Sequence, residues 1–151
     1  MVDLDRYILF TGYIEEIYKS VQKIKAERMS AFGLRSTDTT VIAMLSQHPE
    51  GLTATELAAK CKVDKAVVSR SVKMLFEAGA VKYASDGKKN YRSRLMLDER
   101  GMEIALAMSS MARDAVAAAN EGIAPEELQS FYKVLSTFNR NLKEHAKGIE
   151  S

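Results

Sequence analysis

The chain has 151 residues, of which 46% are hydrophobic and 28% are charged, and its net charge is +2. This is the composition of one globular domain, and no apolar run reaches the roughly 18–20 residues that a membrane span requires. The single cysteine, Cys61, excludes an internal disulfide and a Cys-pair zinc site, and the start MVDLDRYILF lacks the basic segment of a signal peptide. We therefore expect a cytoplasmic protein with no membrane partner.

The charges are unevenly distributed along the chain. From Lys60 to Arg100 there are 11 basic and 5 acidic residues, a net charge of +6, whereas the remainder carries −4. A basic centre between acidic ends is what a surface that meets a polyanion requires. Chance clustering is the alternative.

The first predicted helix runs from Leu4 to Met29. Its length of about 40 Å, at about 1.5 Å per residue, is too great for burial in one small domain. Beside its apolar stripe lies an aromatic face (Tyr7, Phe10 and Tyr13), so we expect this helix to meet a partner. The alternative is an ordinary core helix with a few exposed aromatic residues. The stripe comprises Leu4, Ile8, Thr11, Ile14, Ile17, Tyr18, Val21 and Ile24.

A linker at Ala31–Leu34 precedes a second helix, which extends from Ser36 to about Gln47. The turn His48–Gly51 ends that helix and leads into the next one. Three apolar side chains of the second helix are spaced to face a core: Val41, Ile42 and Leu45.

The stretch Leu52–Gly79 predicts two helices joined by a tight turn. Thr53 with Glu56 is typical of a capping box, and Leu52 with Leu57 of a hydrophobic staple. Asp64 is placed to cap the second helix of the pair, and Gly79 to end it. The second helix has one apolar stripe, which comprises Val68, Val72 and Leu75.

The opposite face of this second helix is basic and polar. An α-helix fits the major groove of DNA, where Ser and Arg can contact base edges and Lys can contact phosphates. The alternative is a solvated amphipathic face. The residues expected to bind DNA are Lys65, Ala66, Ser69, Arg70 and Lys73.

A short hairpin is predicted next, because Val81 and Tyr83 alternate with polar residues, as do Leu95 and Leu97. The turn Asp86–Asn90 joins the two strands. A helix-turn-helix followed directly by a basic hairpin is a winged helix, whose tip reaches the adjacent minor groove or its phosphates. The basic residues of the hairpin are Lys82, Lys88, Lys89, Arg92 and Arg94.

Two further helices complete the chain. The first opens at Asp98, extends to about Asn120 and carries an alanine-rich seam suited to close helix packing. Residues Glu121–Ala124 break it, and Pro125 occupies the first position of the last helix. We expect the last helix to bury Leu128, Phe131, Leu135, Phe138 and Leu142.

The segment DKAVVSRSVKMLFEAGAV, together with the spacing from Asp86 to Leu97-Asp98-Glu99-Arg100-Gly101, resembles the MarR (multiple antibiotic resistance regulator) family of bacterial transcription regulators. Lys88 and Lys89 stand where the family has Arg and Asp, so the usual wing pairing is absent. Lys contacts phosphate as a point charge rather than through a bidentate fork. Asp98 replaces the family's Thr cap, and Asp caps a helix equally well.

The resemblance implies a mainly α fold with a small β-hairpin wing (α+β), formed by one domain over residues 1–151. Residues 36–101 would form the DNA-binding lobe, and residues 1–30 and 102–151 the dimerisation helices. It implies a homodimer that acts as a repressor on a pseudo-palindromic operator. Such a protein would be nucleoid-associated when bound to double-stranded DNA. The other interpretation is a winged helix that binds an acidic protein partner. No catalytic motif and no cofactor site is evident.

Family members often bind small aromatic ligands, and Met44, Met74 and Met108 are candidates to line such a pocket. Methionine as core filler is the alternative. His48 and His145 have no motif partners and are expected at the surface, without a metal. Cys61 is expected to be a small buried hydrophobe, with a redox switch as the alternative.

Overall fold

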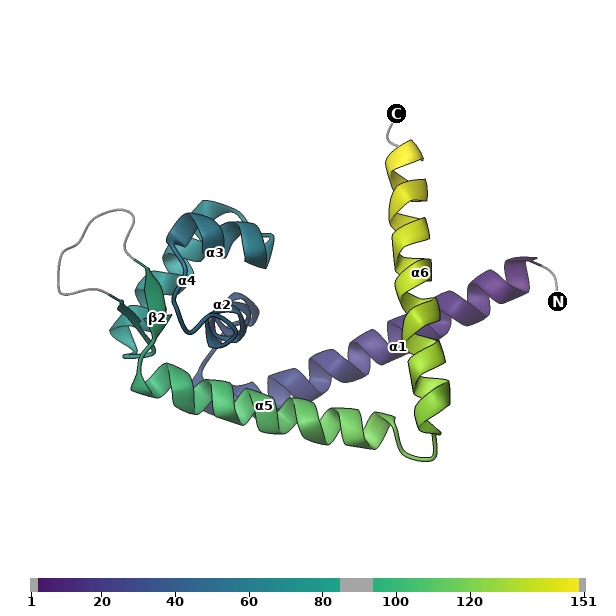
Figure 1. The fold of residues 1–151 in the computed structure, drawn as a ribbon, viewed down its shortest axis with the longest axis horizontal. Helices are drawn as coiled ribbons and strands as arrows, with labels where there is room; N and C mark the ends of the chain where they lie inside the picture. The colour runs from purple at the N-terminus through teal and green to yellow at the C-terminus, as the bar shows by residue number, and fades with distance from the viewer. Residues whose placement is uncertain (1–2, 85–93, 150–151) are drawn as a thin grey trace. The chain divides into compact units, whose positions relative to one another are not determined.

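The computed structural model describes residues 3–84 and 94–149, and it confirms a mainly helical fold with a small antiparallel hairpin (Figure 1). The helices lie close to their predicted positions because their caps and apolar spacings are strong local signals. The elements are α1 (Asp3–Met29), the 3-10 helix η1 (Ser30–Phe32), α2 (Ser36–Ser46), α3 (Ala54–Cys61), α4 (Lys65–Glu77), β1 (Val81–Tyr83), β2 (Leu95–Leu97), α5 (Glu99–Ala119) and α6 (Pro125–Ile149).

The chain divides into two compact units, Met1–Arg113 and Asp114–Ser151, with the boundary inside α5. The first unit contains the winged helix-turn-helix, and the second contains α6. The single domain over residues 1–151, with its lobe and dimerisation segments, stays a prediction. No helix within the described ranges is both long and apolar enough to cross a bilayer.

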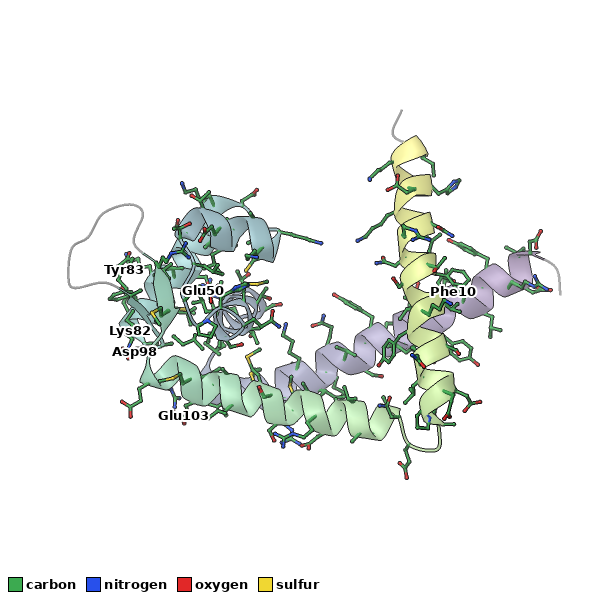
Figure 2. The ribbon with its side chains drawn as sticks, viewed as in Figure 1. Phe10, Glu50, Lys82, Tyr83, Asp98 and Glu103 are labelled. Atoms are coloured by element: carbon green, nitrogen blue, oxygen red, sulfur yellow. The ribbon has the colours of Figure 1, made fainter. Side chains whose placement is uncertain are left out.

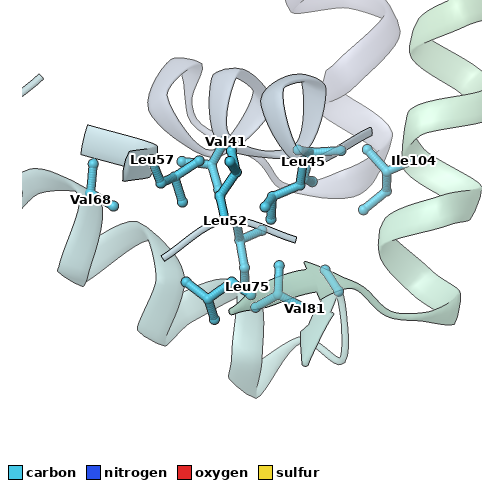
Figure 3. Packing of buried hydrophobic residues seen from close by; sticks show 11 residues of the cluster. Val41, Leu45, Leu52, Leu57, Val68, Leu75, Val81 and Ile104 are labelled. Atoms are coloured by element: carbon cyan, nitrogen blue, oxygen red, sulfur yellow. The ribbon is translucent and has the colours of Figure 1, made fainter. Parts of the chain in front are cut away.

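One hydrophobic core lies in the first unit, between α2, α3, α4, the hairpin and the start of α5 (Figure 3). The inward positions predicted for α2 are confirmed, because Val41, Ile42 and Leu45 are fully buried. Each such side chain stabilises the fold by about 1.5–3 kcal/mol. Val68 and Leu75 of α4 belong to the same core, so the apolar side of α4 is packed against it. Other core residues are Leu52, Leu57, Val68, Leu75, Val81, Leu95 and Ile104.

The predicted helix ends at α3 and α4 are also confirmed. The Glu56 amide donates to Thr53 Oγ1 at 3.2 Å, and the Thr53 amide donates to a Glu56 carboxylate oxygen at 2.9 Å, which completes the capping box. At the end of α4, Gly79 has a φ of +70°. The amides of Gly79 and Ala80 donate to the carbonyls of Phe76 and Leu75, the two bonds of a Schellman motif.

The prediction that α6 buries its apolar stripe is wrong for the single chain. Phe131, Phe138 and Leu142 are about half exposed (52%, 47% and 51%), while Leu128 and Leu135 are half-buried. The stripe is spaced as predicted, but burial also needs a surface to cover it.

Helix α1 likewise has its apolar residues exposed, and Met29 is its buried residue. This excludes the ordinary core helix for a single chain. The segment Ala31–Leu34 was predicted to be a linker, but its first two residues belong to η1. Gly33 follows with a φ of +66°.

Gly101, in the first turn of α5, lies directly against the backbone of Ala80. A Cβ added at Gly101 would overlap the Ala80 carbonyl oxygen. That oxygen also accepts the Asp98 amide at 2.9 Å, so it cannot move aside without breaking this bond. The close approach joins the end of α4 to the start of α5.

We expect Gly101→Ala to lower the free energy of unfolding by about 1–3 kcal/mol, because the new methyl group must displace backbone. Urea denaturation monitored by circular dichroism measures the loss. The control is Gly148→Ala, where an added Cβ meets no atom within 4 Å. Equal urea midpoints for the two variants would contradict the close packing.

Candidate nucleic-acid interface

The turn between α3 and α4 is short and well defined. Lys62 ends α3 in the left-handed region, with φ +54°, and its amide donates to the Ala58 and Ala59 carbonyls. Asp64 occupies the N-cap position of α4 as predicted, but its side chain makes no capping hydrogen bond. Its carboxylate therefore acts on α4 by its charge near the positive helix end.

The predicted DNA-binding residues of α4 share one exposed face. Lys65, Ala66, Ser69, Arg70 and Lys73 are all exposed. At about 100° per residue they span an arc of about 140° around the helix axis. The opposite side is buried, as expected for Val68 and Leu75. The structure thus brings together all five residues that the sequence singled out on this helix.

One residue of the packed side was missed by the sequence analysis. Ser71 is 1% exposed, and its hydroxyl donates to an Asp38 carboxylate oxygen at 2.6 Å. Asp38 belongs to α2 and is fully buried. A serine next to an apolar stripe gave no signal, because its partner lies 33 residues away.

The hairpin pairs Val81 with Leu97 and Tyr83 with Leu95. Leu52, before α3, forms an additional antiparallel bridge with Leu95, through two hydrogen bonds of 3.0 and 2.7 Å. The base of the wing is therefore attached to the segment that caps α3. The predicted DNA-binding residues Lys88, Lys89 and Arg92 lie outside the described residues.

Two cations at the base of the wing make contacts within the protein, and Figure 2 labels one of them, Lys82, together with Asp98. Arg94 Nη1 donates to the Gly51 carbonyl at 2.7 Å and lies 3.5 Å from a Glu56 carboxylate oxygen. Lys82 Nζ lies 3.7 Å from Asp98 Oδ1. Arg94 therefore links the start of β2 to the segment before α3, and Lys82 of β1 pairs with the residue before α5, contacts that their positive charge alone does not reveal.

Comparison with known proteins agrees with this geometry. Residues 32–89 match the model of the MarR family, a segment that includes α2, α3, α4 and β1. The matched segment is similar to the winged helix-turn-helix of the MarR family. The resemblance inferred from the sequence is thereby confirmed. No curated protein matches the chain.

Solved structures of MarR-family proteins share the fold over most of the chain. One MarR family transcription regulator has a TM-score of 0.82 at 21% identity, over 96% of this chain and 95% of its own. Staphylococcus aureus MarR, in complex with salicylate and kanamycin, has a TM-score of 0.75 at 14% identity, over 94% and 95%. A MarR family regulator from Silicibacter pomeroyi has 0.68 at 24%, over 85% and 86%.

The three methionines proposed to line a ligand pocket are all half-buried. Met44 and Met108 pack against the core, which is the contact expected of core filler. The Met74 sulfur lies 3.7 Å from Arg35 Nη2. A pocket formed by these residues stays a prediction.

The described part of the chain holds no cluster of three or more His, Cys, Asp or Glu side chains that could bind a metal ion. His48 is half-buried, and its Nδ1 lies 3.0 Å from Glu50 Oε1, while His145 is exposed. The backbone hydrogen bond of Glu50, followed by the contact with His48, lowers the pKa of the Glu50 carboxyl group.

We expect the Glu56 carboxylate to contribute to stability mainly above its unfolded pKa. The hydrogen bond from the Thr53 backbone lowers the pKa of Glu56 below its ordinary value of 4.5, and the positive charge of Arg94 lowers it further. A carboxyl group with a lowered folded pKa stabilises the fold above pH 4.5, and this stabilisation is lost as pH falls through the folded pKa. Glu56→Gln should therefore flatten the dependence of unfolding free energy on pH below 4.5. An unchanged slope in acid denaturation would contradict this.

We expect Cys61 to react slowly in the folded protein. The thiol is half-buried, and burial raises its pKa, which reduces the reactive thiolate. Alkylation by iodoacetamide near neutral pH should be several-fold slower in buffer than in concentrated urea. Equal rates in the two conditions would restore the redox-switch alternative.

Proposed function

We propose that this chain is a sequence-specific, double-stranded DNA-binding transcription regulator, and that it acts as a repressor. The observation that supports this most is the exposed polar and basic face of α4, set within a MarR-family winged helix. The opposite side of α4 is packed against the core, so this face is available to a groove. A solvated face remains the competing interpretation that experiment must exclude.

In the proposed mechanism, α4 enters the major groove. Ser69 and Arg70 contact base edges, and Ala66, lacking a long side chain, allows close approach to the DNA. Lys65 and Lys73 contact phosphates, and Lys88, Lys89 and Arg92 of the wing contact the minor groove or its phosphates. Base contacts then set the sequence preference, while phosphate contacts contribute affinity for any duplex.

We further propose that the regulator is a homodimer. In the single chain, α1 and α6 each leave large apolar side chains exposed, among them Ile17, Tyr18 and Phe131. A second copy of the chain would cover such faces around a two-fold axis. Two copies of α4 would then lie about 34 Å apart and contact half-sites one helical turn apart.

Control by a small aromatic effector is the final part of the proposal. It is supported by the salicylate bound to the MarR protein from Staphylococcus aureus, whose fold this chain shares. An effector changes DNA occupancy only if its affinity differs between the DNA-bound and DNA-free states. Met44, Met74 and Met108 are the proposed contacts.

Selection of bound fragments from random DNA tests the function directly. We expect the recovered duplexes to share an inverted repeat with half-sites about 10 base pairs apart. Binding should weaken steeply with salt, as phosphate contacts require. Recovery of no preferred duplex at any salt concentration would reject the regulator and favour a winged helix that binds an acidic protein. An enzymatic function has no supporting residue set and is not proposed.

Within this mechanism, Arg70→Ala and Lys73→Ala should have different effects. Loss of a base contact at Arg70 should cost about 1–3 kcal/mol on the selected duplex and relax its specificity. Loss of a phosphate contact at Lys73 should weaken binding to all duplexes and reduce the salt slope by about one unit. Fluorescence anisotropy with selected and shuffled duplexes measures both.

Lys88→Ala is the matched variant in the wing and should behave like Lys73→Ala. If Arg70→Ala and Lys73→Ala weakened both duplexes equally, the assignment of base and phosphate contacts would be wrong.

A further inference from the structure

A buried polar contact joins α2 to the packed side of α4. The Ser71 hydroxyl donates to Asp38 Oδ1 at 2.6 Å, and both side chains are shielded from water. The neighbouring contacts of α4 are apolar, through Val68 and Leu75, which are fully buried. Apolar contact is not directional, whereas a hydrogen bond loses strength when its distance or angle changes.

Asp38 is itself held in one place. Its second carboxylate oxygen accepts the Arg35 backbone amide at 2.9 Å and Arg35 Nε at 3.3 Å. This oxygen therefore closes the first turn of α2, while Oδ1 remains directed at Ser71. The group that receives the Ser71 hydroxyl is thus fixed by the backbone of another helix.

Ser71 differs from other hydroxyl residues of the helices in the direction of its bond. Thr39 and Thr40 donate to carbonyls four residues earlier, at the N-cap and in the first turn of α2. The Ser71 hydroxyl instead bonds to a side chain of a different helix, 33 residues away. A bond between elements restrains their relative position, which a bond within one helix does not.

Because Ser71 lies nearly opposite the exposed face of α4, its hydrogen bond also determines where the residues of that face lie. Ser69 and Lys73, each two residues from Ser71, lie about 160° from it around the axis. Rotation of α4 by about 20° would move side chains at a radius of about 6 Å by about 2 Å. Hydrogen-bond distances vary only between about 2.7 and 3.2 Å, so a displacement of about 2 Å would break the contacts to base edges.

We propose that the buried Asp38–Ser71 hydrogen bond fixes the rotation of α4 about its axis, so that Ser71 and Asp38 are positioning residues for sequence-specific DNA binding. The inference rests on the proposed function. Neither residue faces the DNA in this mechanism. Their removal should lower discrimination between duplexes more than it lowers affinity for DNA in general, because phosphate contacts by long Lys side chains adapt to small displacements.

The test compares Ser71→Ala with Val72→Ala. Both variants shorten to alanine a side chain of α4 that faces the core, Val72 being partly buried there, but Val72→Ala keeps the hydrogen bond. The ratio of dissociation constants for shuffled and selected duplexes is measured at one salt concentration. We expect Ser71→Ala to lower this ratio at least about fivefold, with affinity for the shuffled duplex nearly unchanged. Val72→Ala should keep the ratio of the wild type.

A second measurement needs no DNA. Hydrogen exchange of the α4 amides in the free protein should be faster in Ser71→Ala than in Val72→Ala, after correction for global stability. Equal ratios and equal exchange in the two variants would overturn the proposal. If the wild-type protein preferred no duplex, the proposed function would fail and the specificity role with it. The exchange data would then still decide whether the bond restrains α4.

Discussion

The burial of one side of α4 is the constraint on which the rest of this structure depends. A helix that presents five polar or small residues outward must be held by its other side, where Val68, Ser71 and Leu75 are buried. The α2 helix, the hairpin and the start of α5 form the surface that receives it. Apolar burial supplies the free energy, and the polar contact with Asp38 adds direction.

The wing depends on the same region of the chain. Leu52 bonds to Leu95 of the hairpin, and the capping residue Glu56 lies beside Arg94. The segment that begins α3 therefore also positions the base of the wing. The base of the wing is thus anchored to one short segment.

Local signals explain what the sequence could predict. The capping box at Thr53, the Gly79 turn and the spacing of Val68 and Leu75 depend on residues within one or two helical turns of each other. The exposed face of α4 follows from the same spacing. In contrast, the bonds of Ser71 with Asp38 and of Arg94 with Gly51 join residues far apart in sequence. No periodicity encodes such pairs, so only the folded structure reveals them.

The wrong prediction that α6 buries its apolar stripe has a different cause. Periodicity correctly located an apolar stripe that includes Phe131 and Leu142, yet these side chains are exposed in the single chain. A periodic stripe indicates that a helix face is suited to burial, but it does not indicate which molecule covers that face. Aromatic residues of α1 such as Tyr7 are also exposed in the single chain. Soluble monomers rarely expose large contiguous apolar patches. The proposed regulator would need a second copy of the chain to bind two half-sites, and association of two chains would also cover these apolar faces.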